Sequence, residues 1–415
     1  MTMAEKGSAL RSFKHRNFRI LFTANLVSNI GTWSQRVAQD WLVVTDLHRG
    51  GSALGIVTGL QFLPSLLFSL YSGVLADRFD KRKLLLISNL GGGLTSLILG
   101  ILVIAEKVTL THVFILAFLL GIFNALDAPV RQSFNSEVVG KSDVANAVSL
   151  NAANFNAGRL VGPAITGLMI KAFHTGPSFI LNSISYLAVV IALLFMRKNE
   201  LFLNKQIDDK PKISAAITYV KARPDLLAVM IIVFFAATFG LNFQIFNALI
   251  STKVFAKDAG AFGALGSILA IGALLAALIS AKLDTKRNPK FIATFAILFG
   301  SSLVLISAAP SFAAYSAFLP ICGLVALTTM ISANSYVQVM TAANLRGRVM
   351  GIYLLIVLGG APIGSPLIGW LSDLIGIRET IAICGAITSL AGITTYAILR
   401  EKLNAFKNNQ ERNPN

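Results

Sequence analysis

Three ionisable side chains lie within long apolar stretches of this sequence, where charge is costly and a functional role is expected. Arg36 and Asp40 are four residues apart, so both would lie on one face of a helix. Arg159 lies about midway along a second stretch. If these stretches cross a bilayer, an ionised group at mid-depth costs about 2.5–3.5 kcal/mol, so it should pair, face water or bind a ligand.

Amide side chains accompany these charges. Asn29 continues the face of Arg36 and Asp40, and Asn154 precedes Arg159 by about one turn. We therefore expect this face to form a polar cavity wall. The alternative is a purely structural pair of Arg36 and Asp40 near the outer mouth.

A second pair with the same spacing, Asp127 and Arg131, falls near the end of another apolar stretch. Charges at the membrane interface are inexpensive, and residues four apart on a helix readily pair. We interpret these two residues as a helix-end ion pair or latch.

The composition is typical of a polytopic membrane protein. The 415 residues are 55% hydrophobic and 13% charged with a mean hydropathy of +0.70, whereas soluble proteins carry about 25% charged residues. Lipid offers no hydrogen-bond partners to the backbone, so the spans should be helices. The net charge of +17 lies at the ends of apolar stretches, so we expect a lipid bilayer and no nucleic acid as partner.

Apolar stretches bounded by charges or by Pro and Gly predict an all-α integral membrane fold with twelve transmembrane helices. A long polar segment divides them into an N-terminal six-helix bundle (1–198), a central cytoplasmic loop (199–224) and a C-terminal six-helix bundle with a short tail (225–415). The predicted spans are 18–45, 52–76, 84–105, 111–134, 144–172, 176–197, 225–252, 260–282, 290–308, 312–338, 346–373 and 378–399.

The cations predict the orientation of these spans. With both termini in the cytoplasm, 28 of the 36 Lys and Arg residues fall on the inner side, 6 on the outer side and 2 within spans. Short cytoplasmic loops are enriched in Lys and Arg, so a multi-pass protein of the cell inner membrane with cytoplasmic termini is expected.

The turn between the second and third spans carries Gly73, Asp77, Arg78 and Arg82. This pattern resembles the signature between the second and third helices of major facilitator superfamily transporters. The resemblance covers essentially the whole chain and implies two pseudo-symmetric halves around a midplane cargo site. It implies that the first and fifth spans can face the same cavity, so we expect Asp40 to bind and release a proton and to pair with Arg159 in one of two states. It also implies that the turn is a gating loop that docks on the eleventh span; the alternative, a pure topology anchor, leaves Gly73 and Asp77 unexplained.

Several shorter runs are similar to one branch of that superfamily, the bacterial enterobactin exporters and macrolide efflux permeases. They are 17–19, 28–33, 128–132 and 346–350. In the fifth span, Gly158, Gly162, Pro163 and Gly167 resemble a glycine and proline motif of antiporters. Ordinary close packing of helices is the alternative explanation of this motif.

These observations predict a secondary active transporter that exports a small drug-like or siderophore-like amphipathic molecule by alternating access and proton antiport. An uptake permease or a lysolipid-type flippase is the nearest alternative, and a transporter-like sensor or scaffold is an alternative of another class. We expect a monomer, no cofactor and no metal site. The sequence has no nucleotide-binding glycine loop, metal-ligand cluster or activated nucleophile, so we expect no enzyme.

Overall fold

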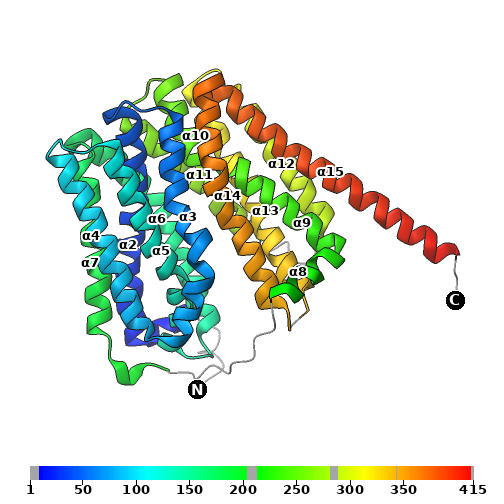
Figure 1. Cartoon of the computed structure of the whole chain (residues 1–415), viewed down its shortest axis with the longest axis horizontal. Coiled ribbons are helices and arrows are strands. Elements are labelled where there is room, and N and C mark those ends of the chain that lie inside the picture. Colours follow the sequence, from blue (N-terminus) through cyan, green and yellow to red (C-terminus); the bar gives the residue numbers. More distant parts are fainter. Residues whose placement is uncertain (1–8, 203–212, 281–287, 343, 413–415) are drawn as a thin grey trace. The chain divides into compact units, whose positions relative to one another are not determined.

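The structure is a computed structural model that describes residues 9–202, 213–280, 288–342 and 344–412. The described residues form α-helices joined by short 3-10, π and turn segments, with no β-strand among them. Each helix is bounded as the apolar stretches predict, by a charge, Pro or Gly at most ends. Figure 1 shows the helices in chain order.

The first half of the chain begins with a short 3-10 helix and continues in six long helices. Their bounds are η1 (Arg11–Lys14), α2 (Arg16–Trp41) with a π-helical end η2 (Leu42–Asp46), α3 (Gly51–Arg78), α4 (Lys81–Ile104), α5 (Leu110–Val139), α6 (Val144–Phe173) and α7 (Gly176–Phe195).

The second half is less regular at its start. Its elements are η3 (Lys198–Glu200), α8 (Ile213–Ala222), α9 (Pro224–Phe235), η4 (Ala236–Gly240), α10 (Phe243–Leu249), η5 (Ile250–Val254), α11 (Ala259–Ser280), α12 (Pro289–Ser307), α13 (Phe312–Met340), α14 (Arg346–Ile375) and α15 (Ile377–Arg412). The predicted span 225–252 is thus interrupted twice by π-helical segments.

Ten segments of the described chain are long and apolar enough to cross a membrane. α2 and α6, with 26 and 30 residues, are as long as the others but are absent from this set because they are more polar. The ten segments together with α2 and α6 make twelve helical segments of spanning length in the described part of the chain. The two more polar helices, α2 and α6, are those that carry Arg36, Asp40 and Arg159.

The chain separates into two compact units, Met1–Asp208 with Ser251–Ser267, and Asp209–Ile250 with Ile268–Asn415. The residues 251–267, which follow the predicted boundary near residue 199, belong to the first of these units. The segment 199–224, predicted to be a loop, contains the helix α8. Its apolar residues Ile213, Ile217 and Val220 recur at helical spacing over only ten residues, too short for a span.

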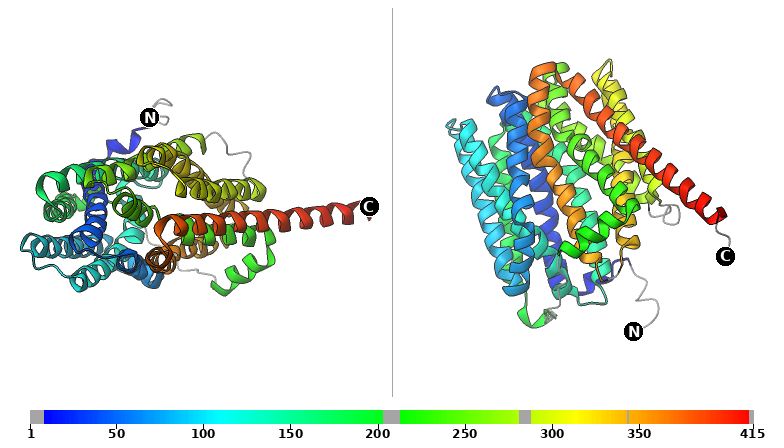
Figure 2. Two further views of the ribbon diagram at one scale, coloured as in Figure 1. Left: turned by 90° about the horizontal axis from the view of Figure 1, so that it is seen from above. Right: turned by 45° about the vertical axis from the view of Figure 1, so that its right-hand side comes forward.

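In the first unit, α2 packs against α6 and α7, α3 against α5, and α4 against both α5 and α7. Large buried side chains fill the end of this bundle nearest the N-terminus, among them Phe18, Leu85, Phe134 and Leu193. The outward faces of α4 and α7 expose Leu and Ile residues, as expected of surfaces that meet lipid tails. In the second unit α12 packs against α13 and α15, and both views of Figure 2 show α15 continuing as one straight helix to its end.

Candidate transport site

The polar face of α2 meets α6 through a pair of asparagines. Asn29 Nδ2 donates to Asn154 Oδ1 at 3.0 Å, and Asn154 Nδ2 donates to the backbone oxygen of Phe22 at 2.9 Å. Both amides are thus used to hold the two helices together. The structure therefore brings the predicted residues Asn29 and Asn154 into direct contact.

Glycines of α6 set how closely the two helices approach. A Cβ atom on Gly158 would lie 2.7 Å from Cβ of Asn29, and one on Gly162 would lie 2.7 Å from Cβ of Trp33. Ser34 Oγ donates to the backbone oxygen of Gly162 at 3.2 Å. Small residues permit such contact between helices in a membrane. In the described structure these two glycines have a packing role.

The second part of the glycine motif faces a different segment of the same unit. A Cβ atom on Gly167 would lie 2.7 Å from the backbone oxygen of Ala259, and the backbone of Pro163 lies against Gly263. Ser267 Oγ donates to the backbone oxygen of Leu160 at 2.6 Å. The start of α11 is therefore packed directly on α6.

These contacts fix the register of α2 and α6, which run parallel. Asn29 lies beside Gly158 and Ser34 beside Gly162, so a residue of α2 lies level with the residue of α6 about 128 positions later. Asp40 is then level with about residue 168, and at 1.5 Å per residue Arg159 is about 14 Å away along the axis. The expected direct pairing of Asp40 with Arg159 is not present in this structure.

Arg36 and Asp40 do not form an ion pair with each other either. The Arg36 guanidinium instead lies over the ring of Trp33, 4.8 Å from its centroid, and 5.3 Å from the centroid of Phe62 on α3. Cation–π contacts of this kind stabilise a desolvated cation. The i, i+4 spacing placed both groups correctly on one helix, but the aromatic rings rather than Asp40 hold Arg36.

Asp40 is buried, with 4% of its surface exposed, and its Oδ2 atom has no hydrogen-bond partner. The neighbouring Gln39 is equally buried, and both polar atoms of its amide lack partners. Arg159 is half-buried, and its Nε and Nη2 atoms also lack partners. Buried polar groups are nearly always hydrogen-bonded, so these unsatisfied atoms are candidates for contact with water, a proton or cargo.

Asp127 and Arg131 form a network that the sequence did not reveal. Arg131 Nε donates to Asp127 Oδ2 at 2.6 Å, and its guanidinium also donates to Asn25 of α2. Ser88 and Asn89 of α4 donate to Asp127 Oδ1 at 2.9 and 2.8 Å. The predicted helix-end pair is therefore an interior junction of three helices. The cause is the length of α5, which continues to Val139 and ends only at Gly140, where φ is +71°.

The residues of the predicted gating loop are only partly described. Gly73 and Asp77 belong to the last turns of α3, but their side chains lie outside the described part, and Arg78 is exposed. Arg82 donates from Nε to the backbone oxygen of Leu193 at 2.7 Å and from Nη2 to that of Leu194 at 3.0 Å. Arg82 therefore caps the carbonyl end of α7, and the docking of this loop on α14 stays a prediction.

The N-terminal segment is bound at the same end of the bundle. The carboxylate of Asp143, immediately before α6, forms ion pairs with Arg11, Lys14 and His15, with N–O distances of 3.3, 2.7 and 2.9 Å. Burial opposes ionisation of this carboxyl, but the hydrogen bonds and charges of Lys14 and His15 prevail and hold its pKa below the usual range. No part of the sequence-based analysis assigned a role to Asp143.

Polar residues of the second unit mostly serve its packing. Asn242 accepts from Ser365 Oγ at 2.7 Å beside the π-helical segment η4, and Asn247 accepts from Tyr315 Oη at 2.9 Å. Within the described ranges, no group of three or more His, Cys, Asp and Glu residues is placed to hold a metal ion. Of the predicted site residues, Asp40 on α2 and Arg159 on α6 are those with unsatisfied polar atoms in the described structure.

The chain is similar to a known protein family and to several known transporters over most of its length. Residues 7–414 match the family described as transmembrane secretion effector. The staphyloferrin A transporter of Staphylococcus aureus is 26% identical over 92% of this chain and 96% of its own length. An enterobactin exporter of Salmonella typhi is 21% identical over 93% of each chain.

Among solved structures, a bacterial homologue of the human lysosomal transporter Spinster superposes with a TM-score of 0.76. It covers 94% of this chain and 98% of its own, at 14% sequence identity. At that identity the similarity establishes a shared fold only. The fold is the all-α transporter architecture that the charged turn and the apolar stretches predicted.

Proposed function

Since the chain belongs to the transmembrane secretion effector family of the major facilitator superfamily, we propose that it exports a small amphipathic molecule across the cytoplasmic membrane by alternating access. It is a multi-pass membrane transporter and not an enzyme. The cargo, the direction of transport and the coupling to protons are the parts that we propose.

One observation carries the proposal. The two rods that are too polar for ordinary spans hold Arg36, Asp40 and Arg159, and none of these three forms an ion pair within the described ranges. Charged residues within membrane helices are rare and usually serve a transport path. Helices with unsatisfied charged and amide groups suit a cargo with polar and apolar parts, such as the molecules for which the two relatives are named.

Asp40 is the group that we propose for proton coupling. Its Oδ2 atom is buried without a partner, and an ionised carboxylate in such surroundings costs several kcal/mol unless it gains a partner or water. Protonation removes that cost. A conformation that hydrates Asp40 therefore favours the ionised form, and one that buries it favours the protonated form, which couples proton binding to the change of state.

Flux in proteoliposomes with an imposed pH gradient tests this coupling. Enterobactin and staphyloferrin A are the cargo probes, and the parent protein should move one of them against proton entry. Asp40→Asn keeps the shape of the side chain but cannot ionise, so it should lose gradient-driven flux while retaining exchange of cargo across the bilayer. Glu106→Gln, an exposed substitution in the α4–α5 connection, is the control. Undiminished gradient-driven flux in Asp40→Asn would remove Asp40 from the mechanism.

The direction of net flux in oriented vesicles separates export from the alternatives of uptake and lipid flipping. Export predicts that cargo moves from the face bearing most Lys and Arg residues to the opposite face. Net movement the other way would support an uptake permease.

A further inference from the structure

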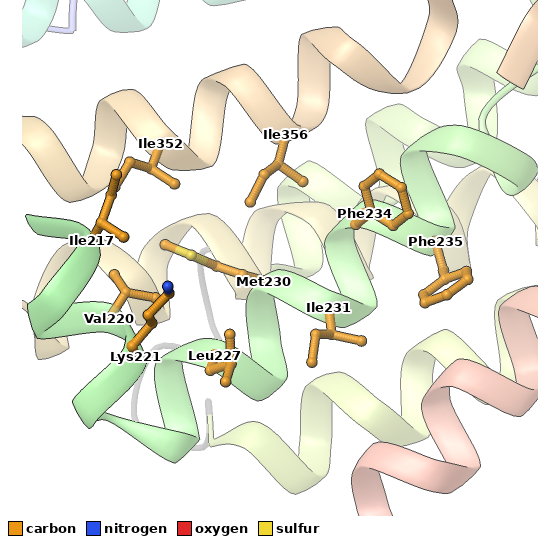
Figure 3. Close-up of a pocket in the computed structure, with 10 residues that line it drawn as sticks. All are labelled: Ile217, Val220, Lys221, Leu227, Met230, Ile231, Phe234, Phe235, Ile352 and Ile356. Carbon is orange, nitrogen blue, oxygen red and sulfur yellow. The ribbon is translucent and has the colours of Figure 1, made fainter. Parts of the chain in front are cut away.

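A cavity of about 300 Å³ lies in the second unit. α8, α9 and α14 line it with nine apolar side chains and one cation, Lys221. Figure 3 shows Lys221 beside Val220 at the α8 end, and Phe234 and Phe235 at the opposite end. The cavity is thus lined by apolar side chains and has a single positive charge toward one end.

Lys221 is a cation without an acidic neighbour in the described part of the chain. Its side chain is exposed. The nearby cation Arg223 is already paired with Asp225, at 2.7 Å, and Asp225 also accepts from Tyr336. Any anion at the α8 end of the cavity would therefore meet Lys221 rather than Arg223.

A second cation, Arg348, lies on the face of α14 that lines the cavity. Arg348, Ile352 and Ile356 are spaced four apart, so they share one face of the helix, and the two isoleucines line the cavity. The Nη1 atom of Arg348 is buried and has no hydrogen-bond partner. An unsatisfied guanidinium one turn from the cavity wall is a suitable donor for a phosphate oxygen.

The dimensions fit a lipid tail. From Leu227 to Phe235 the wall formed by α9 extends about 12 Å at 1.5 Å per residue. α8 has its apolar residues at helical spacing and is too short to span, as in helices that lie in the membrane interface. The abundance of Lys and Arg at this end of the chain's helices assigns it to the cytoplasmic leaflet.

We propose that this cavity binds one anionic phospholipid of the inner leaflet, with an acyl chain along α9 and the phosphate at the end marked by Lys221 and Arg348. The lipid would join α8 and α9 to α14 within the second unit. The proposal concerns residues of the second unit alone, and its test does not depend on the proposed transport function.

Native mass spectrometry of the purified full-length protein tests the proposal. Delipidated protein is mixed with phosphatidylglycerol, with phosphatidylcholine of the same chains, or with inorganic phosphate alone. One phosphatidylglycerol should be retained more strongly than phosphatidylcholine. Lys221→Gln should weaken its retention by about fivefold, the effect expected of one cation near a lipid headgroup. Lys290→Gln, at the start of α12, should leave it unchanged.

A pocket-filling variant tests the acyl-chain part. Ile231 is 40% exposed in the cavity wall, so Ile231→Trp can fold while occupying the space of the chain, and it should abolish the one-lipid complex. Ile271→Trp, on α11 and 47% exposed, is the matched control. Equal retention of the two lipids, no effect of Lys221→Gln, or binding of inorganic phosphate alone would each overturn the proposal.

Discussion

Arg131 is the residue whose removal should affect stability most directly. It neutralises Asp127, and the amides of Asn25 and Asn89 complete the junction. Arg131→Met leaves the Asp127 carboxylate without its cation among three helices. Removing one partner of a buried pair costs about 3–5 kcal/mol, and because both side chains here keep about a fifth of their surface exposed we expect about 2–3 kcal/mol.

Unfolding in detergent as a function of denaturant measures this loss. Arg197→Met is the control, since Arg197 and Glu200 form an exposed i, i+3 pair that should contribute less than about 1 kcal/mol. The double variant Asp127→Asn with Arg131→Met should recover part of the stability. A single variant Arg131→Met as stable as the parent would show that the junction does not stabilise the fold.

At this scale the sequence revealed residue types better than partners. The spacing of Arg36 and Asp40, and of Asp127 and Arg131, was enough to place each pair on one helical face. Which group each cation binds depends on the neighbouring helix, for example Phe62 beside Arg36 and Asn25 beside Arg131. Sequence periodicity contains no information about the relative rotation of two helices, so those contacts were beyond prediction.

Among the elements, the contact of α2 with α6 depends on the absence of a side chain at Gly158. Gly158→Ala would bring a Cβ atom to 2.7 Å from Cβ and 2.8 Å from the backbone carbon of Asn29. The two helices must then separate, at a cost of about 1–3 kcal/mol typical of overpacking. Thermal unfolding should detect this, together with weaker transport.

A helical glycine without neighbours provides the control. Nothing lies within 4 Å of a Cβ atom built on Gly351 of α14, so Gly351→Ala should be neutral or should stabilise by up to about 1 kcal/mol. If both alanine variants had the same stability as the parent, close packing at Gly158 would not limit the approach of α2 to α6.

The docking of η1 should depend on pH through Asp143. The pKa of this carboxyl is lowered in the folded protein, so its ionisation stabilises docking above the unfolded value of about 3.9, and this contribution is lost as the pH falls through the lower folded value. Arg11, Lys14 and His15 face it. Because Lys14 is well exposed, we expect a change of about fivefold in the docking equilibrium, or ~1 kcal/mol.

Hydrogen exchange of residues 11–15 reports this docking. Protection in the parent should fall toward that of Asp143→Asn as the pH drops below about 4, while at neutral pH Asp143→Asn should already exchange faster. Comparing the two proteins at each pH removes the intrinsic pH dependence of exchange. Identical protection of both proteins at neutral pH would rule out an anchoring role for Asp143.

The elements themselves were largely predictable, because each apolar stretch had to form a helix in lipid. Their ends were not. α5 continues five residues beyond its predicted end at 134, since no Pro or Gly lies between that residue and Gly140. The π-helical segments η4 and η5 left no signal in hydropathy, because they change the backbone without changing which residues are apolar.

For the whole molecule, the family and the fold followed from one charged turn and the composition. The contacts of α2 and α6 in that fold explain why a hydropathy threshold alone finds ten spans in the described chain rather than twelve. α2 and α6 are more polar than the other spans and so bury less apolar surface in lipid. The hydrogen bond between Asn29 and Asn154 and the close contacts of the neighbouring glycines stabilise the two helices against each other instead. Such compensation depends on tertiary structure, whereas the division of the sequence into apolar stretches at charges, Pro and Gly had indicated twelve spans.

The orientation of the molecule in the membrane is the prediction on which the direction of transport depends. Short connections on the cytoplasmic face are enriched in Lys and Arg, which assigns Lys83 and Lys198 to the inside and Lys107 to the outside. All three are exposed, whereas the native Cys322 and Cys384 are buried. Single cysteines at the three lysine positions, in a variant with both native cysteines replaced by alanine, can therefore be labelled selectively.

A membrane-impermeant thiol reagent applied to intact cells should label Lys107→Cys and spare Lys83→Cys and Lys198→Cys until the cells are permeabilised. The positions before α4 and after α7 should behave alike, because an even number of spans lies between them. Labelling of Lys83→Cys and Lys198→Cys from opposite sides would require an odd number and would invalidate the two-bundle architecture. Labelling of both from outside, with Lys107→Cys protected, would preserve the architecture and reverse the direction of export.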